Sequence, residues 1–370
     1  ESAKTSRKGV TDFVKLADYR KKYEFVSILG NGAFGKVRLH IDRSCKSMKY
    51  AIKTIKKENI TPDLLNCIIE EVKILSQLDH PNIVKYYETY EDDHYIHIVM
   101  EYLQGEDLFK VISMRKYNQF TEKDASDIIR NLLKALSFIH KKGIVHRDIK
   151  PQNILFSQSG DYNSLKLIDF GLSTLQKPKN RQRVGSPYYM APEIINGMYS
   201  GKTDIWSVGV ILFIMVTGSY PFEAKSQAEI FDKIQYEDYN RKLLENKKCS
   251  HEVKDLIDHL LKKREVDRYN VDEALEHNWF KQFNLIESII LDDEILKNLR
   301  EFTKMNLLQK EILFYIAKIS RDEELNKLKK VFSELDKDNT GTLEREEILN
   351  AFKQCGIKIN NVYYFYVRMK

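Results

Sequence analysis

Four side chains in the middle of the chain have the types and spacing that transfer of a phosphoryl group requires. Asp148, Lys150 and Asn153 lie within six consecutive residues, and Asp169 follows 16 residues after Asn153. A carboxylate such as Asp148 can accept the proton of a hydroxyl, and a lysine such as Lys150 can bind a phosphoryl group. Asn153 and Asp169 offer oxygen ligands of the kind that Mg²⁺ takes in proteins.

The strings around these residues are HRDIKPQN at 146–153 and DFG at 169–171. Together they resemble the catalytic and metal-binding loops of eukaryotic protein kinases. The resemblance implies a two-lobed α+β fold that transfers the γ-phosphate of ATP with the help of Mg²⁺. The run Gly-Ser-Pro-Tyr-Tyr at 185–189 resembles the peptide-binding loop of Ser/Thr kinases. It implies protein Ser/Thr substrates, and a contact of the Ser186 hydroxyl with the catalytic acid and lysine.

A glycine-rich run, GNGAFGKV at 30–37, leads into strand-like residues at 36–41 and 50–53. Glycines allow backbone amides to approach phosphates closely. The same spacing occurs in Rossmann dinucleotide sites, but there the glycines open a helix, whereas a strand follows here. The pattern therefore favours a kinase hairpin. The expected nucleotide-binding residues of this region are Gly30, Asn31, Gly32, Ala33, Phe34, Gly35, Val37, Ala51 and Lys53.

Lys53 is expected to bind the α and β phosphates and to be oriented by a carboxylate on the following helix, which is predicted over 64–78. Two neighbouring residues, Glu70 and Glu71, compete for that role. Glu71 is preferred because it shares the inward helix face with Ile74. Glu70 is then a solvated residue.

Residues 96–102 predict a buried strand that leads into a hinge. The kinase resemblance implies that backbone groups of residues 101–103 pair with adenine and that Met100 lies at the back of the pocket. It places Asp107 where relatives contact ribose or a substrate arginine. Kinases that prefer basic substrates carry a second acid, at the position that Gln152 occupies here. Because only the first acid, Asp107, is present, the predicted preference for Arg three residues before the target is moderate. The expected contacts of this region are Met100, Glu101, Leu103 and Asp107.

Further positions match the kinase family in structural roles. Glu193 is expected to form a buried ion pair with Arg268, and Asp204 to hold the backbone of the catalytic loop. Arg147 in many kinases pairs with a phosphate or carboxylate at the position that Gln182 occupies here. Because glutamine is neither acidic nor phosphorylatable, activation by phosphorylation there is not expected. The partner of Arg147 is left open.

A second motif lies downstream. The run DKDNTGTLEREE at 336–347 has oxygen donors at loop positions 1, 3, 5, 7 and 9, glycine at 6 and glutamate at 12. This is the pattern of an EF-hand loop, in which Ca²⁺ takes about six to eight oxygens. Thr340 replaces the usual Asp or Asn, which weakens the predicted site. The expected Ca²⁺ ligands are Asp336, Asp338, Thr340, Thr342 through its carbonyl, and Glu347 through both carboxylate oxygens.

A kinase domain followed by an EF-hand resembles the calcium-dependent protein kinases. Residues 291–300 and 307–319 form amphipathic runs like the junction of that family, which blocks the kinase until the Ca²⁺-loaded module withdraws it. One complete loop is found where the family carries four, and residues 360–370 contain no second loop. Calcium control by the chain itself therefore competes with control by separate calmodulin and with no calcium control. A pseudokinase scaffold is disfavoured because all four catalytic side chains are present.

The predicted fold class is α+β, a two-lobed protein kinase fold followed by an all-α junction and EF-hand segment. The predicted parts are an N-terminal extension at 1–22, a kinase domain at 23–280 with an N-lobe at 23–102 and a C-lobe at 103–280, an autoinhibitory junction at 281–322, and an EF-hand segment at 323–370.

Composition limits the partners. The chain carries 60 Lys and Arg against 54 Asp and Glu in 370 residues, a mild excess that does not predict nucleic-acid binding. Four cysteines without metal or disulfide spacing favour a reducing compartment, so a cytoplasmic location is expected. No run reaches the roughly 18 apolar residues of a membrane span. The sequence begins at Glu1, so membrane attachment through an acylated upstream segment is left open.

Overall fold

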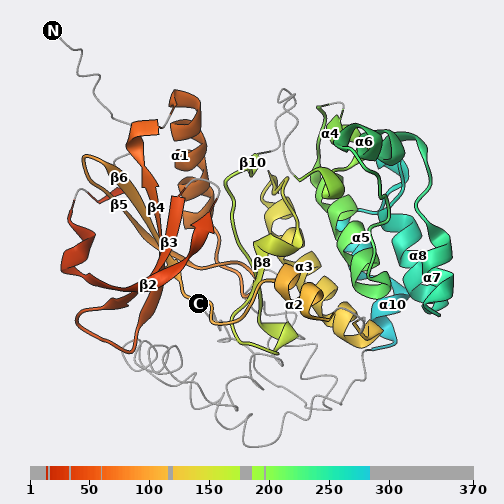
Figure 1. Ribbon diagram of the computed structural model, residues 1–370, viewed down its shortest axis with the longest axis horizontal. Coiled ribbons are helices and arrows are strands. Elements are labelled where there is room, and N and C mark those ends of the chain that lie inside the picture. The colour runs from red at the N-terminus through yellow and green to blue at the C-terminus, as the bar shows by residue number, and fades with distance from the viewer. Residues whose placement is uncertain are drawn as a thin grey trace, which may run out of the picture. The chain divides into compact units, whose positions relative to one another are not determined.

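The computed structural model describes residues 14–15, 17–32, 35–59, 61–115, 120–175, 186–195 and 197–283. These residues belong to the first of two compact units, Glu1–Phe283 and Asn284–Lys370. The predicted junction from residue 284 onward, the EF-hand ligands, Gln182, and two residues of the glycine-rich run, Ala33 and Phe34, lie outside the described residues. Within them, a β-rich region precedes a helical region (Figure 1).

The N-terminal region is a six-stranded sheet with strand order β1-β5-β6-β4-β3-β2. Its strands are β1 (Val14–Lys15), β2 (Tyr23–Gly32), β3 (Gly35–Asp42), β4 (Lys49–Lys56), β5 (Tyr86–Glu91) and β6 (Tyr95–Glu101). Neighbouring strands pair antiparallel, except that β1 runs parallel to β5. Successive side chains of a strand point to opposite faces. Both faces of β4 are accordingly packed, with Ile52 in one apolar cluster and Ile55 in another.

Helix α1 (Pro62–Ser76) follows β4 and begins and ends two residues earlier than predicted. Proline is favoured at the first helical position because the amide it lacks would be unpaired there. One helical turn separates Ile68 from Val72, and both pack against Ile55, Ile96 and Ile98 of the sheet. This packing turns the face that carries Glu71 toward the sheet.

The C-terminal region is helical. Its helices are α2 (Leu108–Met114), α3 (Glu122–Lys141), α4 (Pro192–Ile195), α5 (Gly201–Thr217), α6 (Gln227–Tyr236), α7 (Arg241–Asn246), α8 (His251–Leu260), α9 (Val271–Leu275) and α10 (Asn278–Lys281). Every residue of α5 from Thr203 to Thr217 is buried. Trp206 on α5 and Trp279 on α10 are fully buried in the core. None of the described helices is long and apolar enough to cross a membrane.

Four short strands frame the two catalytic motifs. They are β7 (Ile144–Val145), β8 (Ile154–Phe156), β9 (Leu165–Leu167) and β10 (Thr174–Leu175). β7 pairs with β10, and β8 pairs with β9. The loop at 146–153 therefore joins one strand of each pair, and the loop at 168–173 joins the other two. This topology holds the two motifs side by side.

Two residues upstream of the predicted kinase boundary at Tyr23 pair with the sheet of the N-terminal region. Val14 pairs with Thr89 and Lys15 with Tyr90. A 3₁₀ helix, η1 (Tyr19–Lys21), follows and is capped by Asp18. A strand of two residues has too little periodicity to be detected in a polar, basic stretch.

The N-terminal segment is fastened to the sheet by one carboxylate. Glu88 on β5 is 8% exposed. It accepts hydrogen bonds from Lys15, from Lys22 Nζ (2.8 Å), from the Tyr23 hydroxyl and from the Tyr90 hydroxyl (3.0 Å). Burial raises the pKa of Glu88, but these four donors outweigh it and lower the pKa to about 2. Glu88 is therefore ionised in the folded chain and stabilises it above the pKa of the unfolded state.

We expect Glu88→Gln to lower the free energy of unfolding of the N-lobe by about 2 kcal/mol at pH 7, because a charged acceptor with several donors becomes neutral. Since the folded pKa lies below the unfolded one, the difference from the unchanged chain should shrink as pH falls from about 4.5 toward about 2. Hydrogen exchange of the β1 and β5 amides measures this. Glu24→Gln, at an exposed ion pair with Arg43, serves as the control; equal protection in both variants would contradict the role of Glu88.

Candidate active site

Three of the predicted catalytic side chains contact the carboxylate of Asp148. Lys150 Nζ lies 2.5 Å from its Oδ2, and Asn153 Nδ2 donates to the same oxygen (3.0 Å) and to the Asp148 carbonyl (2.8 Å). The Ser186 hydroxyl donates to Oδ1 at 3.2 Å. Ser186 and Lys150 thus contact opposite oxygens of one carboxylate. The carboxylate is 8% exposed, so its orientation is set by these donors, with Oδ1 directed at a hydroxyl.

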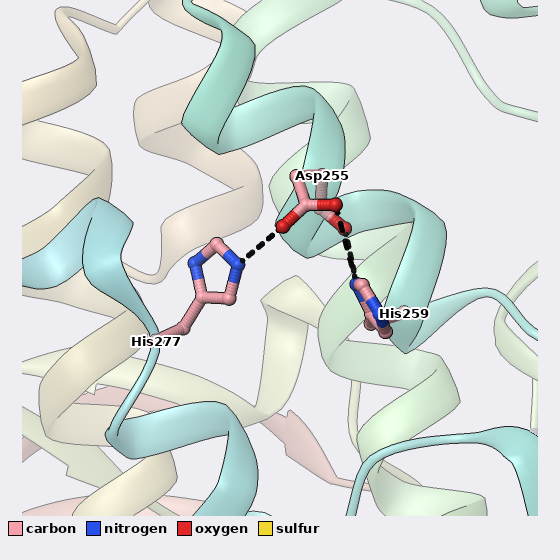
Figure 2. A group of neighbouring side chains, drawn as sticks. All are labelled: Asp255, His259 and His277. Atoms are coloured by element: carbon pink, nitrogen blue, oxygen red, sulfur yellow. Dashed lines mark hydrogen bonds and ion pairs between the residues drawn. The ribbon is translucent and has the colours of Figure 1, made fainter.

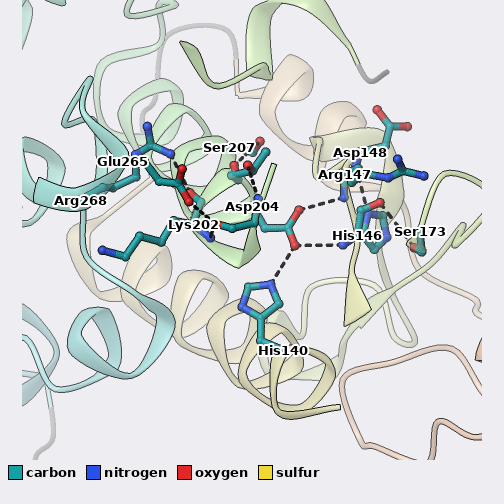
Figure 3. Close-up of polar contacts among 12 residues, drawn as sticks. His140, His146, Arg147, Asp148, Ser173, Lys202, Asp204, Ser207, Glu265 and Arg268 are labelled. Atoms are coloured by element: carbon teal, nitrogen blue, oxygen red, sulfur yellow. Dashed lines mark hydrogen bonds and ion pairs between the residues drawn. The ribbon is translucent and has the colours of Figure 1, made fainter. Parts of the chain in front are cut away.

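Asp204 holds the backbone that precedes Asp148, as predicted. Its Oδ2 accepts from the His146 amide at 3.0 Å and lies 2.8 Å from His140 Nε2, and its Oδ1 accepts from the Arg147 amide at 2.9 Å (Figure 3). Burial raises the pKa of Asp204, but the hydrogen bond to His140 and the nearby imidazoles and amide lower it below its usual value. The ionised carboxylate therefore binds the loop through charge-assisted hydrogen bonds.

Two residues that flank the site have left-handed backbone conformations. The φ angles of Arg147 and Asp169 are 67° and 62°. Such angles are uncommon for residues other than glycine and cost free energy, which surrounding contacts must offset. At Arg147 the contact with Asp204 does so. At Asp169, the preceding amide of Ile168 donates to the Asn153 carbonyl at 2.9 Å, which places Asp169 next to Asn153.

Lys53 links the sheet, α1 and the second motif. Its Nζ lies 2.7 Å from Glu71 Oε1 and 3.5 Å from Asp169 Oδ1. Of the two competing carboxylates, Glu71 makes the ion pair and is 2% exposed, whereas Glu70 is exposed. Burial lowers the pKa of Lys53, but Glu71 and Asp169 outweigh it and raise the pKa above the usual value. The buried ammonium is therefore charged and able to bind phosphate.

The donor set fits Mg²⁺. Both hydrogen bonds of the Asn153 amide group are donated by Nδ2, so Oδ1 is oriented away from these donors and can serve as a ligand. Asp169 is partly exposed beside it and supplies carboxylate oxygens. Mg²⁺ is usually bound by one or two such oxygens together with substrate phosphates.

The glycines of the glycine-rich run lie in the paired strands β2 and β3. Gly32 is the cross-strand partner of Gly35, and Gly30 is the partner of Val37. A Cβ at Gly35 would lie 2.1 Å from the Thr54 carbonyl oxygen, so packing there allows only glycine. A Cβ at Gly30 would meet no atom within 4 Å, so packing does not explain that glycine. Asn31 is the cross-strand partner of Lys36.

The hinge contains the expected adenine-facing residues. Ala51 and Met100 are cross-strand partners of β4 and β6. The Glu101 amide donates to the Lys85 carbonyl (2.9 Å), which removes it from the expected donors to adenine. The Glu101 side chain accepts from the Lys85 amide (2.7 Å) and fastens the hinge. Within the described part of the chain, the Leu103 amide has no acceptor, so it can donate to a ligand.

Asp107 has a structural contact in addition to its expected place at the cleft. It is the N-cap of α2, and its carboxylate accepts from the Lys110 amide at 2.8 Å. Asp107 also forms a β-bridge with Leu155. In β8, Ile154 and Phe156 are buried while Leu155 between them is partly exposed, so Leu155 points to the opposite face. The bridge between Asp107 and Leu155 was not predicted from the sequence.

As predicted, a buried ion pair is formed by Glu193, the last residue of the segment from Asp169 to Glu193, here termed the activation segment. Arg268 Nη1 and Nη2 bind Glu193 Oε1 and Oε2 at 2.5 and 2.9 Å. Arg268 is 1% exposed and also donates to the carbonyls of Lys202 (2.9 Å) and Lys262 (3.0 Å). The bidentate geometry satisfies both partners. Loss of either one would leave an uncompensated buried charge.

A second group of titratable side chains, Asp255, His259 and His277, lies in the C-terminal region (Figure 2). His277 Nε2 lies 2.9 Å from Asp255 Oδ2, and its Nδ1 accepts the Trp279 amide at 3.2 Å. His259 Nδ1 lies 2.8 Å from the Asp255 carbonyl. An imidazole nitrogen that donates to an oxygen has no lone pair for a metal. These bonds therefore fasten α8 to the start of α10, and sequence analysis had not singled them out.

Comparison with known proteins agrees with this arrangement. The family model described as "Protein kinase domain" matches residues 23–280, and an EF-hand domain model matches residues 327–356. The first match contains both catalytic motifs, Lys53 and Glu71. The second contains the whole predicted calcium loop.

Similar proteins carry both parts. Calcium-dependent protein kinase 4 of Plasmodium falciparum is 36% identical over 345 residues, which cover 91% of this chain and 65% of that protein. Calcium-dependent protein kinase 4 of Arabidopsis thaliana is 36% identical over 344 residues, covering 92% of this chain and 68% of that protein. The chain thus spans about two thirds of the length of these relatives, and slightly less for the Plasmodium protein. With a kinase domain, an EF-hand and this identity, the chain belongs to the calcium-dependent protein kinase family.

Proposed function

We propose that this chain is a Ser/Thr protein kinase that transfers the γ-phosphate of ATP to protein hydroxyls under the control of Ca²⁺. The observation that carries the proposal is the geometry of Asp148, whose Oδ1 accepts a serine hydroxyl at 3.2 Å while Lys150 and Asn153 hold its other oxygen. A substrate hydroxyl that replaced the Ser186 hydroxyl would meet a general base in hydrogen-bond reach. The Lys53 ammonium lies 3.5 Å from Asp169 Oδ1, so one cation lies next to a predicted Mg²⁺ ligand and can bind phosphate.

In this mechanism, Asp148 accepts or orients the proton of the substrate hydroxyl. The hydroxyl oxygen forms a bond to the γ-phosphorus, and the bond between the γ-phosphorus and the bridging oxygen breaks, so that ADP leaves. Lys53, held by Glu71, binds the α and β phosphates and orients the leaving group. Lys150 offsets the charge on the transferred group. Bound Mg²⁺, for which Asn153 and Asp169 supply oxygens, would neutralise charge on the β and γ phosphates.

We propose protein substrates in which Arg precedes the target residue. The support is Asp107, the N-cap of α2, at the position where the kinase resemblance implies a contact with ribose or a substrate arginine. Its hydrogen bond to the Lys110 amide uses one carboxylate oxygen, Oδ1, and an ionised carboxylate can accept from a guanidinium at the other. Gln152 provides no second charge, so we expect a moderate preference. Calcium control rests on the loop at 336–347 and the amphipathic junction, both outside the described residues.

We also propose a cytoplasmic location. Among the described residues, Cys45, Cys67 and Cys249 are free thiols. Free thiols persist where the compartment is reducing.

Asp148→Asn is expected to lower kcat for phosphate transfer to a Ser/Thr peptide by about 10²- to 10⁴-fold, because the amide cannot accept the proton. ATP affinity should change less than about twofold, since the carboxylate faces Ser186 and not Lys53. Turnover and ATP binding of the full chain measure both. Asp232→Asn, at an exposed residue of α6, is the control, and turnover by the Asp148 variant equal to that control would refute the assignment.

Neutralising Glu71 and Glu70 in turn tests which of the two carboxylates orients Lys53. Glu71→Gln removes the ionic partner of Lys53 and should lower kcat/KM for ATP by about 10- to 100-fold, because the lysine loses its orientation. Glu70→Gln changes a neighbouring exposed residue and should leave kcat/KM within about twofold. The same steady-state assay compares the two. Equal losses would mean that the helix as a whole, and not the ion pair, had been disturbed.

Calcium dependence is tested on the chain alone, without calmodulin, in saturating Ca²⁺ and in chelator. Glu347→Gln should raise the Ca²⁺ concentration for half-maximal activity at least about tenfold, because a bidentate ligand is lost. Activity in chelator should not change. Glu346→Gln, one residue away and not a predicted ligand, is the control. A chain that responds to Ca²⁺ only after calmodulin is added would support control by a separate calmodulin instead.

A further inference from the structure

The inference concerns Arg147, the residue immediately before Asp148. Its guanidinium carries a charge in a half-buried place, and burial lowers its pKa. Nε donates to the Leu172 carbonyl at 2.5 Å. In the described part of the chain, no carboxylate forms an ion pair with this guanidinium. The position at which an acidic or phosphorylated partner would stand in sequence is Gln182, which has no charge.

An aromatic ring takes the place of such a partner. The guanidinium carbon lies 4.8 Å from the centre of the Tyr199 ring. A cation within about 6 Å of a ring centre is attracted by the negative face of the ring, and more strongly where water is excluded. Tyr199 is partly buried and packs against the main apolar core. It immediately precedes Ser200, the N-cap of α5, so the ring is attached to the start of that helix.

Arg147 is thereby held at two points by one segment. Asp204, in the first turn of α5, accepts its amide, and Tyr199, just before α5, contacts its side chain. The φ angle of 67° at Arg147 is unfavourable for a residue with a Cβ. The Asp204 contact offsets this cost, and the Tyr199 contact adds a second attachment through the side chain. The bond to Leu172 extends the connection to the residues that follow Asp169.

We propose that Tyr199 is a positioning residue for phosphoryl transfer: its ring holds the Arg147 guanidinium and so keeps Asp148 oriented without phosphorylation of the activation segment. The proposal rests on the kinase function proposed above and adds to it a positioning residue and a form of regulation. In this proposal, the face of the Tyr199 ring is required to hold the Arg147 guanidinium, and the Tyr199 hydroxyl is not. Removal of the ring should affect the chemical step more than nucleotide binding, because Lys53 and Glu71 are not attached to Tyr199.

The test compares Tyr199→Leu with Tyr199→Phe in the full chain, with Mg·ATP, saturating Ca²⁺ and a Ser/Thr peptide. We expect Tyr199→Leu to lower kcat about 5- to 30-fold with KM for ATP within about twofold, and Tyr199→Phe to restore kcat to within about twofold. Phosphatase treatment of the unchanged chain should leave kcat unaltered. Tyr162→Leu is the matched control, since Tyr162 packs against the same core and contacts Arg115 at 5.4 Å, away from Arg147.

Three results would overturn the proposal: unchanged kcat in Tyr199→Leu, a loss in Tyr199→Phe as large as in Tyr199→Leu, or an equal loss in Tyr162→Leu. Hydrogen exchange of the amides at 146–149 provides a readout that does not need activity. Exchange should accelerate about tenfold in Tyr199→Leu and return to normal in Tyr199→Phe. If the unchanged chain transferred no phosphate, the kinase function would fail, and this exchange pattern would still support or reject the positioning role.

Discussion

The site depends on one buried carboxylate, that of Asp204. Its two oxygens receive two consecutive amides of the catalytic loop and the ring of His140. Because α5 is buried almost all round, it cannot shift without disturbing the core. The position of the loop that carries Asp148 is therefore fixed by its hydrogen bonds to α5, a helix that is buried along most of its length. This is the support that a catalytic side chain on a short irregular loop requires.

The N-lobe positions the second part of the site, which contains Lys53 and Glu71. Lys53 reaches from β4 to Glu71 on α1 and to Asp169 in the helical region. A shift of α1 would separate Glu71 from the lysine and leave a buried charge without its partner, which is costly. The backbone strain at Asp169 is located where this ammonium lies. The geometry of the nucleotide site is thus a joint property of both lobes, and whatever moves α1 controls it.

Local pattern and motif spacing predicted the catalytic loop, and the helix face predicted that Glu71 and not Glu70 meets Lys53. Other features could not be predicted, because they depend on contacts between distant residues. Lys15 and Glu88 are 73 positions apart, and nothing in a two-residue strand indicates its partner. The contact of Tyr199 with Arg147 requires a turn whose direction is set by tertiary packing. Such long-range contacts have no periodic signal in a single sequence.

The short strand β1 occupies one edge of the sheet, next to β5. An uncovered edge presents a row of unpaired amides and carbonyls to other chains. A shortened chain that began at Tyr23, where the kinase family match starts, would lose β1 and both lysines that contact Glu88. It would keep the whole catalytic apparatus and yet tend to associate through β5. We therefore expect the residues needed for solubility to begin further upstream than those needed for catalysis.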